Sequence, residues 1–353
     1  MIASLSASLI ESAILSSASD IHFTPSPQQT FVSFRIAGKL QKHRQLPNEL
    51  AEKLIAQYKF LSGMDIGECR RPQSSAYMTM VRNEKVFLRF STLPTVNNQE
   101  GLVIRVIPQH QSYSMGNLTV FRNDRHKLLR LLQKSNGLFL ITGPTGSGKT
   151  TTLYSLLQVA LEQQHCEILT LEDPVERYCE QFTQIQINEK AGLSYEEGII
   201  AALRYDPDIL VIGEIRNTLT AKMAIRAAYT GHLVISTLHT KRASDALFRL
   251  RELGIPAIDM EQTLIGIAAQ QLVNLKCKHC LKNCSYSCNS EQNVNRTAIF
   301  EILTEEELSH AVRGIDSGQT GEPICSFFKQ LRKAFALGYI AKGAIESSGF
   351  MEK

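Results

Sequence analysis

The chain has 353 residues, of which 43% are hydrophobic and 20% charged, a composition that excludes a disordered, collagen-like or charged coiled-coil protein. Its net charge of +4 comes from residues 1–112, which contain 12 basic and 8 acidic residues. This excess is small for a nucleic-acid-binding protein, but it could favour contact with an acidic membrane surface or an acidic partner. The sequence has no apolar run of about 18 residues, which excludes a membrane-spanning helix. It has no basic residue before Asp20, which excludes a signal peptide. We therefore expect a cytoplasmic chain, and its length predicts two domains.

The first third of the chain has the pattern of a small α+β domain. Residues 20–26 and 31–40 predict two strands around a Pro/Gln turn, and the helical spacing of Leu50, Leu54 and Tyr58 predicts a helix over 47–60. The runs MTMV, VFLRFS and LVIRVI then predict three further strands. We expect an α+β domain over 1–110, followed by a polar linker at 111–117.

Beyond the linker, strands alternate with helices. Apolar runs at 137–143, 167–173, 208–214 and 233–239 predict buried strands. One helix is predicted to start at Ser194 with a capping box, and another to carry leucines and alanines as far as Gly254. Continuous apolar strands between helices indicate a parallel-rich sheet covered on both faces, so residues 118–353 are predicted to form an α/β domain.

A phosphate-binding loop is the strongest motif. The pattern G-x-x-x-x-G-K-[ST] lies between a predicted strand and a predicted helix at Thr151–Ala160, the context that separates a true site from a chance glycine-rich turn. Backbone N–H groups and the helix N-terminus would bind ATP phosphates, the lysine would reach the β- and γ-phosphates, and the Thr150 hydroxyl could bind Mg²⁺. The predicted nucleotide-binding residues are Gly143, Pro144, Thr145, Gly146, Ser147, Gly148, Lys149, Thr150 and Thr151.

Acidic residues follow two of the predicted strands. The strand at 208–214 delivers Glu214 to the sheet edge, where it could polarise an attacking water; the alternative is a solvated strand end. Glu172 and Asp173 follow the strand at 167–173. If that strand neighbours the strand before the phosphate loop, these carboxylates face the metal and the water; otherwise they form an ordinary acidic turn.

Two histidines flank the strand LVISTL. His239 would lie at its C-terminal end, level with the γ-phosphate, and could sense that phosphate. His232 lies at the other end of the same strand. A hydrogen-bonded structural histidine is an equally good interpretation of each.

Four segments in this order, GPTGSGKTTT, TLEDPVE, DPDILVIGEIR and TGHLVISTLHT, resemble the Walker A, Asp box, Walker B and His box of secretion and type IV pilus ATPases. ASDIHF and RFSTLPT resemble the N-terminal domain of the same family, so the resemblance covers about residues 18–303. The phrases MDIGECRRPQ, LVIRVIPQ, QINEKAG and EQTLIGIAAQQLV are most similar to members that assemble competence pili. One departure is Asn217, where the family's Walker B segment has an aspartate.

The resemblance implies a RecA-like P-loop ATPase domain behind a small α+β domain. It implies an ATP-hydrolysing, Mg²⁺-dependent homo-hexamer that powers a competence pilus or pseudopilus for DNA uptake. The motor would act on a polytopic membrane platform protein at the inner face of the cell membrane, without binding DNA itself. Carried over, the catalytic residues are Glu214, Glu172, Asp173, His239, Arg89 and Arg105, the two arginines reaching toward the γ-phosphate. By pattern alone these arginines could equally be solvent-facing strand residues.

Four cysteines cluster at Cys277, Cys280, Cys284 and Cys288. Four thiolates suit tetrahedral Zn²⁺, although the second pair is more widely spaced than in the usual ribbon of this family. Free thiols on one helix face and another metal are the alternatives. The spacing lacks the pattern of a bacterial iron–sulfur run.

Three other functions compete with pilus assembly. A retraction motor or type II secretion ATPase belongs to the same class, but retraction motors usually lack the cysteine cluster. A RecA-like nucleic-acid translocase would need a basic or aromatic groove, whereas residues 113–353 carry balanced charge. A nucleotide-dependent regulator would bind ATP without needing to hydrolyse it.

Overall fold

The computed structural model describes residues 2–36, 38–96, 99–109, 115–276, 296–315, 326–341 and 345. Its contacts divide the chain into two units, Met1–Gln111 with Glu176–Tyr178, and Ser112–Val175 with Cys179–Lys353. Of the expected linker, residues 111–114 lie outside the described part, and a short helix, α3 (Met115–Leu118), occupies its end. None of the described helices is both long and apolar enough to cross a membrane.

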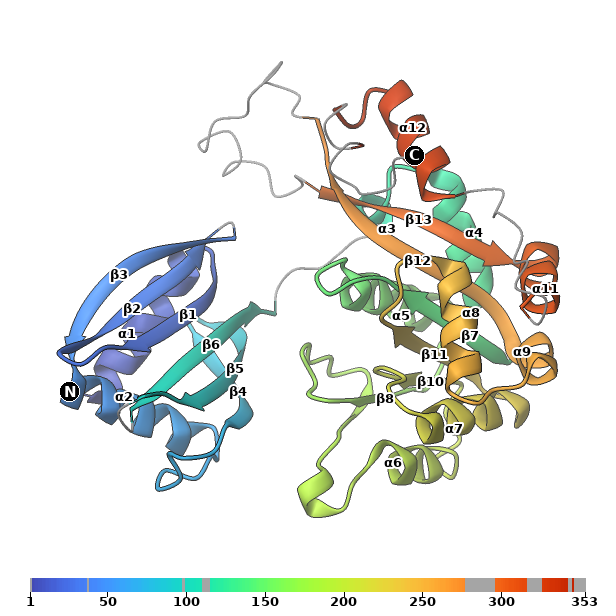
Figure 1. Cartoon of the computed structure of the whole chain (residues 1–353). Coiled ribbons are helices and arrows are strands. Elements are labelled where there is room, and N and C mark those ends of the chain that lie inside the picture. The colour runs from blue at the N-terminus through green and yellow to red at the C-terminus, as the bar shows by residue number, and fades with distance from the viewer. Residues whose placement is uncertain are drawn as a thin grey trace. The chain divides into compact units, whose positions relative to one another are not determined.

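The N-terminal unit is one antiparallel sheet covered by two helices (Figure 1). Its six strands lie in the order β3-β2-β1-β6-β5-β4, and α1 and α2 contact each other and the sheet. The elements are α1 (Ile2–Leu15), β1 (Ala18–Pro25), β2 (Gln29–Ile36), β3 (Lys39–Pro47), α2 (Asn48–Leu61), β4 (Gln73–Val81), β5 (Glu84–Pro94) and β6 (Glu100–Pro108).

Two features of this unit differ from the sequence-based prediction. The single strand expected over 31–40 is wrong, because β2 ends at Ile36 and β3 begins at Lys39. Gly38 between them has φ +81°, a left-handed conformation that glycine adopts without steric cost. Helix α1 was not predicted; it buries Leu9, Ile10 and Ala13 in the core of the unit.

The second unit is an α/β domain built on a seven-stranded sheet in the order β13-β12-β7-β11-β10-β8-β9. All neighbouring pairs are parallel except β12 and β13, which confirms the parallel-rich prediction. The strands are β7 (Gly137–Thr142), β8 (Ile168–Glu172), β9 (Thr183–Gln186), β10 (Ile209–Ile212), β11 (Leu233–Leu238), β12 (Leu264–Asn274) and β13 (Arg296–Thr304). Strands β12 and β13 were not predicted.

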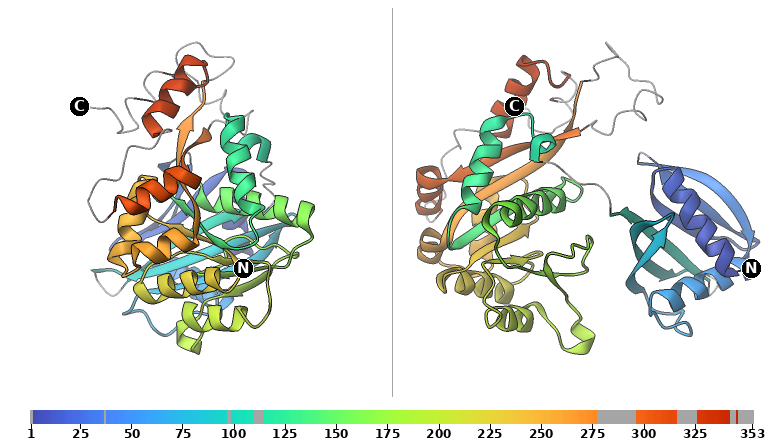
Figure 2. Two further views of the ribbon diagram at one scale, coloured as in Figure 1. Left: turned by 90° about the vertical axis from the view of Figure 1, so that its right-hand side faces the viewer. Right: turned by 180° about the vertical axis from the view of Figure 1, so that it is seen from behind.

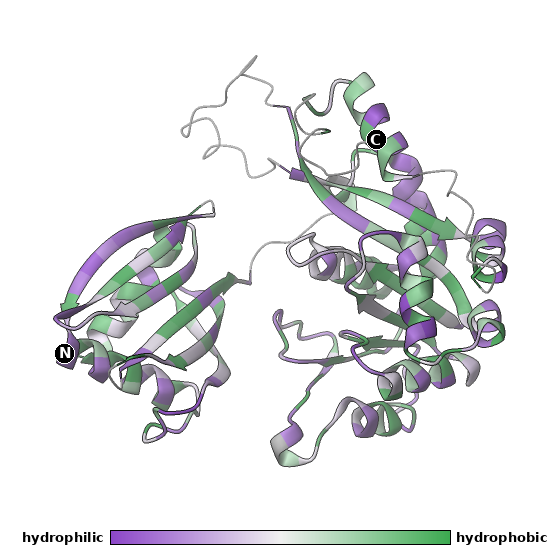
Figure 3. Cartoon of the chain, in the orientation of Figure 1, coloured by the Kyte–Doolittle hydropathy of each residue, from purple (hydrophilic) through white to green (hydrophobic). Residues whose placement is uncertain are grey.

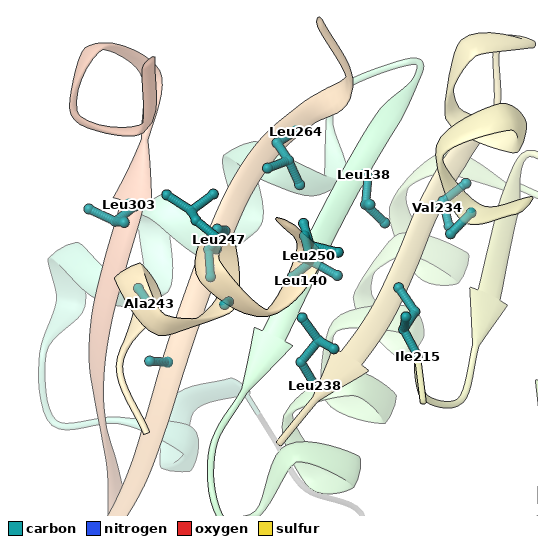
Figure 4. Packing of buried hydrophobic residues seen from close by; sticks show 14 of the residues in the cluster. Leu138, Leu140, Ile215, Val234, Leu238, Ala243, Leu247, Leu250, Leu264 and Leu303 are labelled. Carbon is teal, nitrogen blue, oxygen red and sulfur yellow. The ribbon is translucent and has the colours of Figure 1, made fainter. Parts of the chain in front are cut away.

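Helices cover both faces of this sheet (Figure 2). One core cluster unites the sheet with α3, α4 and α5, and the other unites it with the remaining helices. Figure 4 shows Leu250 beside Leu140, with Leu247 lying between Leu250 and Leu303. The helices are α4 (Arg122–Leu132), α5 (Lys149–Gln164), α6 (Tyr195–Ala202), α7 (Thr218–Tyr229), α8 (Ala243–Glu252), α9 (Ala257–Thr263), α11 (Glu305–Arg313) and α12 (Phe327–Ala336), with a 3₁₀ turn η2 (Glu189–Ala191).

Local capping explains where three helices begin. The Ser194 hydroxyl accepts a hydrogen bond from the Glu197 N–H and starts α6. Asn217 Oδ1 accepts from the Thr220 N–H at 2.8 Å and starts α7. Because asparagine caps as well as aspartate, the departure at the end of the Walker B segment keeps the helix start intact. Buried Glu301 on β13 accepts from the Ala243 N–H at the start of α8.

Candidate active site

The phosphate loop lies between β7 and α5, as the motif predicts. Two of its glycines are required by their surroundings. Gly143 has φ +154°, and a Cβ there would lie 2.5 Å from the Gln270 carbonyl oxygen. Gly148 has φ +87°, and its Cβ would lie 2.9 Å from Gln270 Nε2. Any larger residue at either position would therefore clash with β12 or strain the loop.

Lys149 is the central cation of the loop. Its Nζ donates to the carbonyl oxygens of Gly143 at 2.7 Å and Pro144 at 3.1 Å, and the residue is only 8% exposed. Burial lowers the pKa of Lys149, while the nearby Glu214 carboxylate opposes that shift. The ammonium group is thus held over the loop by neutral oxygens, which a phosphate could replace with charged ones.

The sheet order brings the ends of β11 and β10 next to this loop. Strand β11 pairs directly with β7, and β10 pairs with β11. His239 Nδ1 lies 3.5 Å from Lys149 Nζ, and His239 Nε2 lies 3.4 Å from Glu214 Oε2. The predicted Lys149, Glu214 and His239 therefore form one cluster.

The contacts of His239 favour one tautomer. A lysine ammonium can only donate, so a hydrogen bond with Lys149 makes Nδ1 the acceptor and leaves the ring proton on Nε2, facing Glu214. Burial and the charge of Lys149 lower the pKa of His239, while the Glu214 carboxylate opposes this shift. The imidazole bridges the loop lysine and the carboxylate. His232, at the other end of β11, instead contacts the Thr230 hydroxyl at 3.2 Å.

Arg216 joins the carboxylates at this edge of the sheet. Its Nη2 donates to Glu214 Oε1, and its Nη1 lies 3.7 Å from Asp173 Oδ2. The Glu214 hydrogen bond raises the pKa of Arg216. Arg216 was not predicted as a site residue, although its position two residues after Glu214 was a usable signal. The arginine orients Glu214 and links it to Asp173.

Glu172 lies in a different environment. The conditional expectation that its strand neighbours the phosphate-loop strand is wrong, because β11 and β10 separate β8 from β7. Glu172 is buried, and its Oε1 accepts from the Tyr154 hydroxyl at 2.6 Å and the Thr170 hydroxyl at 2.8 Å. Tyr154 belongs to α5, so this carboxylate ties the helix of the phosphate loop to β8.

Arg89 and Arg105 are cross-strand neighbours in the N-terminal sheet. They are paired residues of the adjacent strands β5 and β6. Arg105 Nε donates to Asp20 Oδ1 at 3.0 Å, and Asp20 is paired with Arg105 across β1 and β6. Two like charges at opposite positions disfavour each other. This carboxylate therefore offsets part of the repulsion and fixes the direction of Arg105.

Gln270 on β12 supports the phosphate loop from behind and was not predicted. Its Nε2 donates to the Ser147 carbonyl at 2.7 Å, and its Oε1 accepts from the Thr152 hydroxyl at 2.7 Å. The residue is 1% exposed. The pair of glutamines, Gln270 and Gln271, within a largely apolar strand was the available signal, because buried amides are kept where their hydrogen bonds are satisfied. Gln270 thus ties the loop and the first turn of α5 to β12.

We expect Gln270→Leu to weaken ATP binding by roughly tenfold, because it leaves the Ser147 carbonyl and the Thr152 hydroxyl without these partners, each at a cost of about 1–3 kcal/mol. The KM for ATP should rise more than kcat falls, which steady-state kinetics measures. Thr152→Ser keeps the hydroxyl and is the matched control. An unchanged nucleotide affinity in a folded Gln270→Leu protein would contradict this role.

The four clustered cysteines Cys277, Cys280, Cys284 and Cys288 lie outside the described residues. Within the part of the chain that the structure describes, no group of three or more His, Cys, Asp or Glu side chains is arranged to hold a metal ion. The described cysteines Cys69, Cys166 and Cys179 are unpaired thiols.

Comparisons with known proteins agree with these features. Residues 1–337 match the family described as Type II/IV secretion system protein. The chain is 43% identical over 350 residues to the Competence protein ComGA of Bacillus subtilis (strain 168), covering 99% of this chain and 98% of the relative. It is 40% identical over 273 residues to the Putative type II secretion system protein E of Escherichia coli (strain K12), covering 77% of this chain but only 55% of that relative.

Solved structures share the fold. The crystal structure of the pilus retraction motor PilT with bound ADP superimposes with a TM-score of 0.72 at 24% identity, covering 98% of this chain and 97% of that one. The ATPase DotB of Yersinia pseudotuberculosis gives a TM-score of 0.74 at 21% identity, covering 96% and 92%. The resemblance carried by the four sequence motifs is confirmed by the family match and the ComGA alignment. The chain belongs to the type II/IV secretion system protein family.

Proposed function

We propose that this chain is an ATP-hydrolysing motor that powers assembly of a competence pilus for DNA uptake in natural transformation. The observation that carries the proposal is the cluster of Lys149, His239 and Glu214 at the phosphate loop. The near full-length alignment with a protein named for competence supports the biological context. Pilus retraction and type II secretion are the alternatives within the class.

The phosphate loop binds the triphosphate. Its backbone N–H groups and the N-terminus of α5 attract phosphate oxygens, and Lys149 exchanges the carbonyls of Gly143 and Pro144 for the β- and γ-phosphates. The exposed hydroxyl of Thr150 and the carboxylates of Asp173 and Glu214 are oxygen donors, the ligand chemistry that Mg²⁺ takes, directly or through water. Magnesium bound there would neutralise charge developing on the phosphates.

Glu214 is the group that activates water in this proposal. Arg216 and His239 hold its two oxygens, so the carboxylate is oriented before the nucleotide arrives. When Lys149 turns toward phosphate, His239 loses its partner at Nδ1 and can respond to the γ-phosphate. Asp173 supports the same cluster through Arg216, and Glu172 positions β8 against α5.

We also assign Arg89 and Arg105 a catalytic role, as the family resemblance implies. An arginine placed on a transferring phosphoryl group stabilises the charge of the transition state. Asp20 holds Arg105 by an ion pair, so a phosphate would find this guanidinium already oriented on the sheet.

The assembly proposed for the chain is a homo-hexamer at the cytoplasmic face of the cell membrane. It acts on a polytopic platform protein and does not bind DNA itself.

The cysteine cluster 277–288 is proposed to hold one structural zinc ion, since four thiolates match the tetrahedral preference of zinc. Elemental analysis of the purified chain is the direct measurement, and well under one zinc per chain would reject this proposal.

The function is tested by the phenotype of a strain that lacks this chain. We expect loss of transformation with protein secretion and surface motility intact. Loss of secretion would favour a type II secretion ATPase, and pili that form but fail to retract would favour a retraction motor. Wild-type transformation would contradict the proposal.

A further inference from the structure

The balanced charge of the second unit conceals a strongly basic surface. Helices α4 and α12 together carry seven basic residues and one acidic residue. We name this set the α4–α12 basic surface: Arg122, Arg125, Lys127, Arg130, Lys329, Arg332 and Lys333. Figure 3 shows hydrophilic residues on both helices.

The two helices contact each other through their one acidic residue. Asp124 on α4 is buried and accepts from Gln330 Nε2 of α12 at 3.2 and 3.3 Å. Its carboxylate interacts with the charges of Lys127 and Lys333, one from each helix, although burial is the dominant effect and raises the pKa of Asp124 to about 6. The buried Asp124 carboxylate therefore links α4 to α12, and the charged side chains that both helices expose are basic.

Aromatic rings contact two of these cations. Arg332 lies 5.6 Å from the ring centroid of Phe328, and Lys333 lies 4.9 Å from that of Phe121. Such contacts keep a cationic head group presented at the surface while its stem is covered.

Exposed apolar residues continue from the end of α12. Phe335 is 44%, Leu337 57% and Tyr339 41% exposed. Basic residues of α12 therefore lie close in sequence to exposed aromatic and aliphatic side chains at the end of the helix and just beyond it. Segments that bind a membrane surface use this combination, with cations at the lipid phosphates and apolar side chains among the upper acyl chains.

We propose that the α4–α12 basic surface, with the apolar end of α12, docks on an anionic phospholipid membrane. The inference rests on the proposed function in taking the membrane as the place where the chain works, and it identifies the surface that meets the lipid. A second copy of the chain is a poorer complement, because the N-terminal residues 1–112 are themselves net basic and the second unit is neutral overall.

The test is co-flotation of the purified full chain with vesicles of phosphatidylcholine, with and without phosphatidylglycerol. We expect binding only to the anionic vesicles, weakened by salt, and reduced roughly tenfold or more by Lys329→Glu with Arg332→Glu. The first change places glutamate three residues after the helix-capping Ser326, which favours the helix start. Leu337→Ser should weaken binding without changing the salt dependence.

Lys39→Glu with Lys42→Glu on the exposed edge strand β3 is the matched control, since it changes net charge equally. Basal ATPase activity should stay unchanged in all these variants, so a failure of lipid binding is distinguishable from a failure of the proposed motor. Equal loss in the control, no binding to anionic vesicles, tighter binding to duplex or single-stranded DNA, or loss of oligomer in the α12 variant would each overturn the proposal.

Discussion

Replacing Lys149 with alanine is expected to abolish both ATP hydrolysis and transformation. The substitution removes the only side-chain cation that the phosphate loop itself provides, and charge-assisted hydrogen bonds of this kind contribute about 1.5–3 kcal/mol each to binding. Nucleotide affinity should therefore fall by roughly ten- to a hundredfold, and hydrolysis should fall further because charge on the γ-phosphate grows in the transition state. Phosphate release by the purified protein and transformation of a complemented deletion strain measure the two effects.

Lys222→Ala is the control, because that lysine lies exposed on α7 and outside the site. It removes the same charge and should leave both readouts at the wild-type level. Normal DNA uptake in cells that carry only the Lys149→Ala protein would refute the motor, even if the purified variant had lost ATP binding.

Local sequence features predicted the parts of the fold that local physics determines. The strand, loop and helix around Lys149 follow from glycines at positions that need unusual φ values and from an apolar run before them. Helix α6 begins after the predicted capping residue Ser194, and α8 ends at Glu252, close to the predicted end at Gly254. Helix α1 was missed because its Ser-rich sequence has a weak pattern, even though Leu9, Ile10 and Ala13 have helical spacing.

Sheet order could not be predicted in the same way. Glu172 and Glu214 both end apolar strands, and nothing in either segment tells which strand lies nearer to β7. The order β7-β11-β10-β8 places His239 beside the loop and Glu214 next to it. Pairing between distant segments decides that order.

Supporting residues were missed for a related reason. Gln270 lies 123 residues from its partner Ser147, and Asp20 lies 85 residues from Arg105. The sequence alone does not tell whether a polar residue on a strand is exposed or buried, because that depends on a partner far away in the chain. The family resemblance supplied the proposed catalytic residues but gave no partner for Gln270 or Asp20.

In the proposed mechanism, the contacts among Lys149, His239 and Glu214 would change when nucleotide binds. Lys149 donates to the loop carbonyls and lies 3.5 Å from His239 Nδ1. Movement of the ammonium toward phosphate would remove this contact and free the imidazole to rotate. The Thr240 N–H, next to His239, donates to the Thr142 hydroxyl at 3.0 Å. His239 is therefore the sequence neighbour of a residue that is hydrogen-bonded to the end of β7.

Glu214→Gln is expected to separate ATP binding from ATP hydrolysis. The amide has nearly the same shape as the carboxylate but cannot take a proton from water, so the rate should fall by about 10²–10⁴. Binding should be nearly unchanged, since Lys149 and the loop are intact. Equilibrium binding of ATP and single-turnover phosphate release measure the two quantities separately.

The surroundings of Glu214 also make this variant the sharpest test between a motor and a regulator. Arg216 and His239 donate to the two carboxylate oxygens, whereas glutamine offers one acceptor and must turn its NH₂ group toward the other donor. Asp173→Asn, which removes the second carboxylate near Arg216, is a useful comparison because it should affect hydrolysis less than Glu214→Gln.

Cells that carry Glu214→Gln should hold an ATP-bound protein and fail to take up DNA if hydrolysis drives the machine. Full transformation in such cells would instead identify a binding switch, because nucleotide occupancy alone would then suffice.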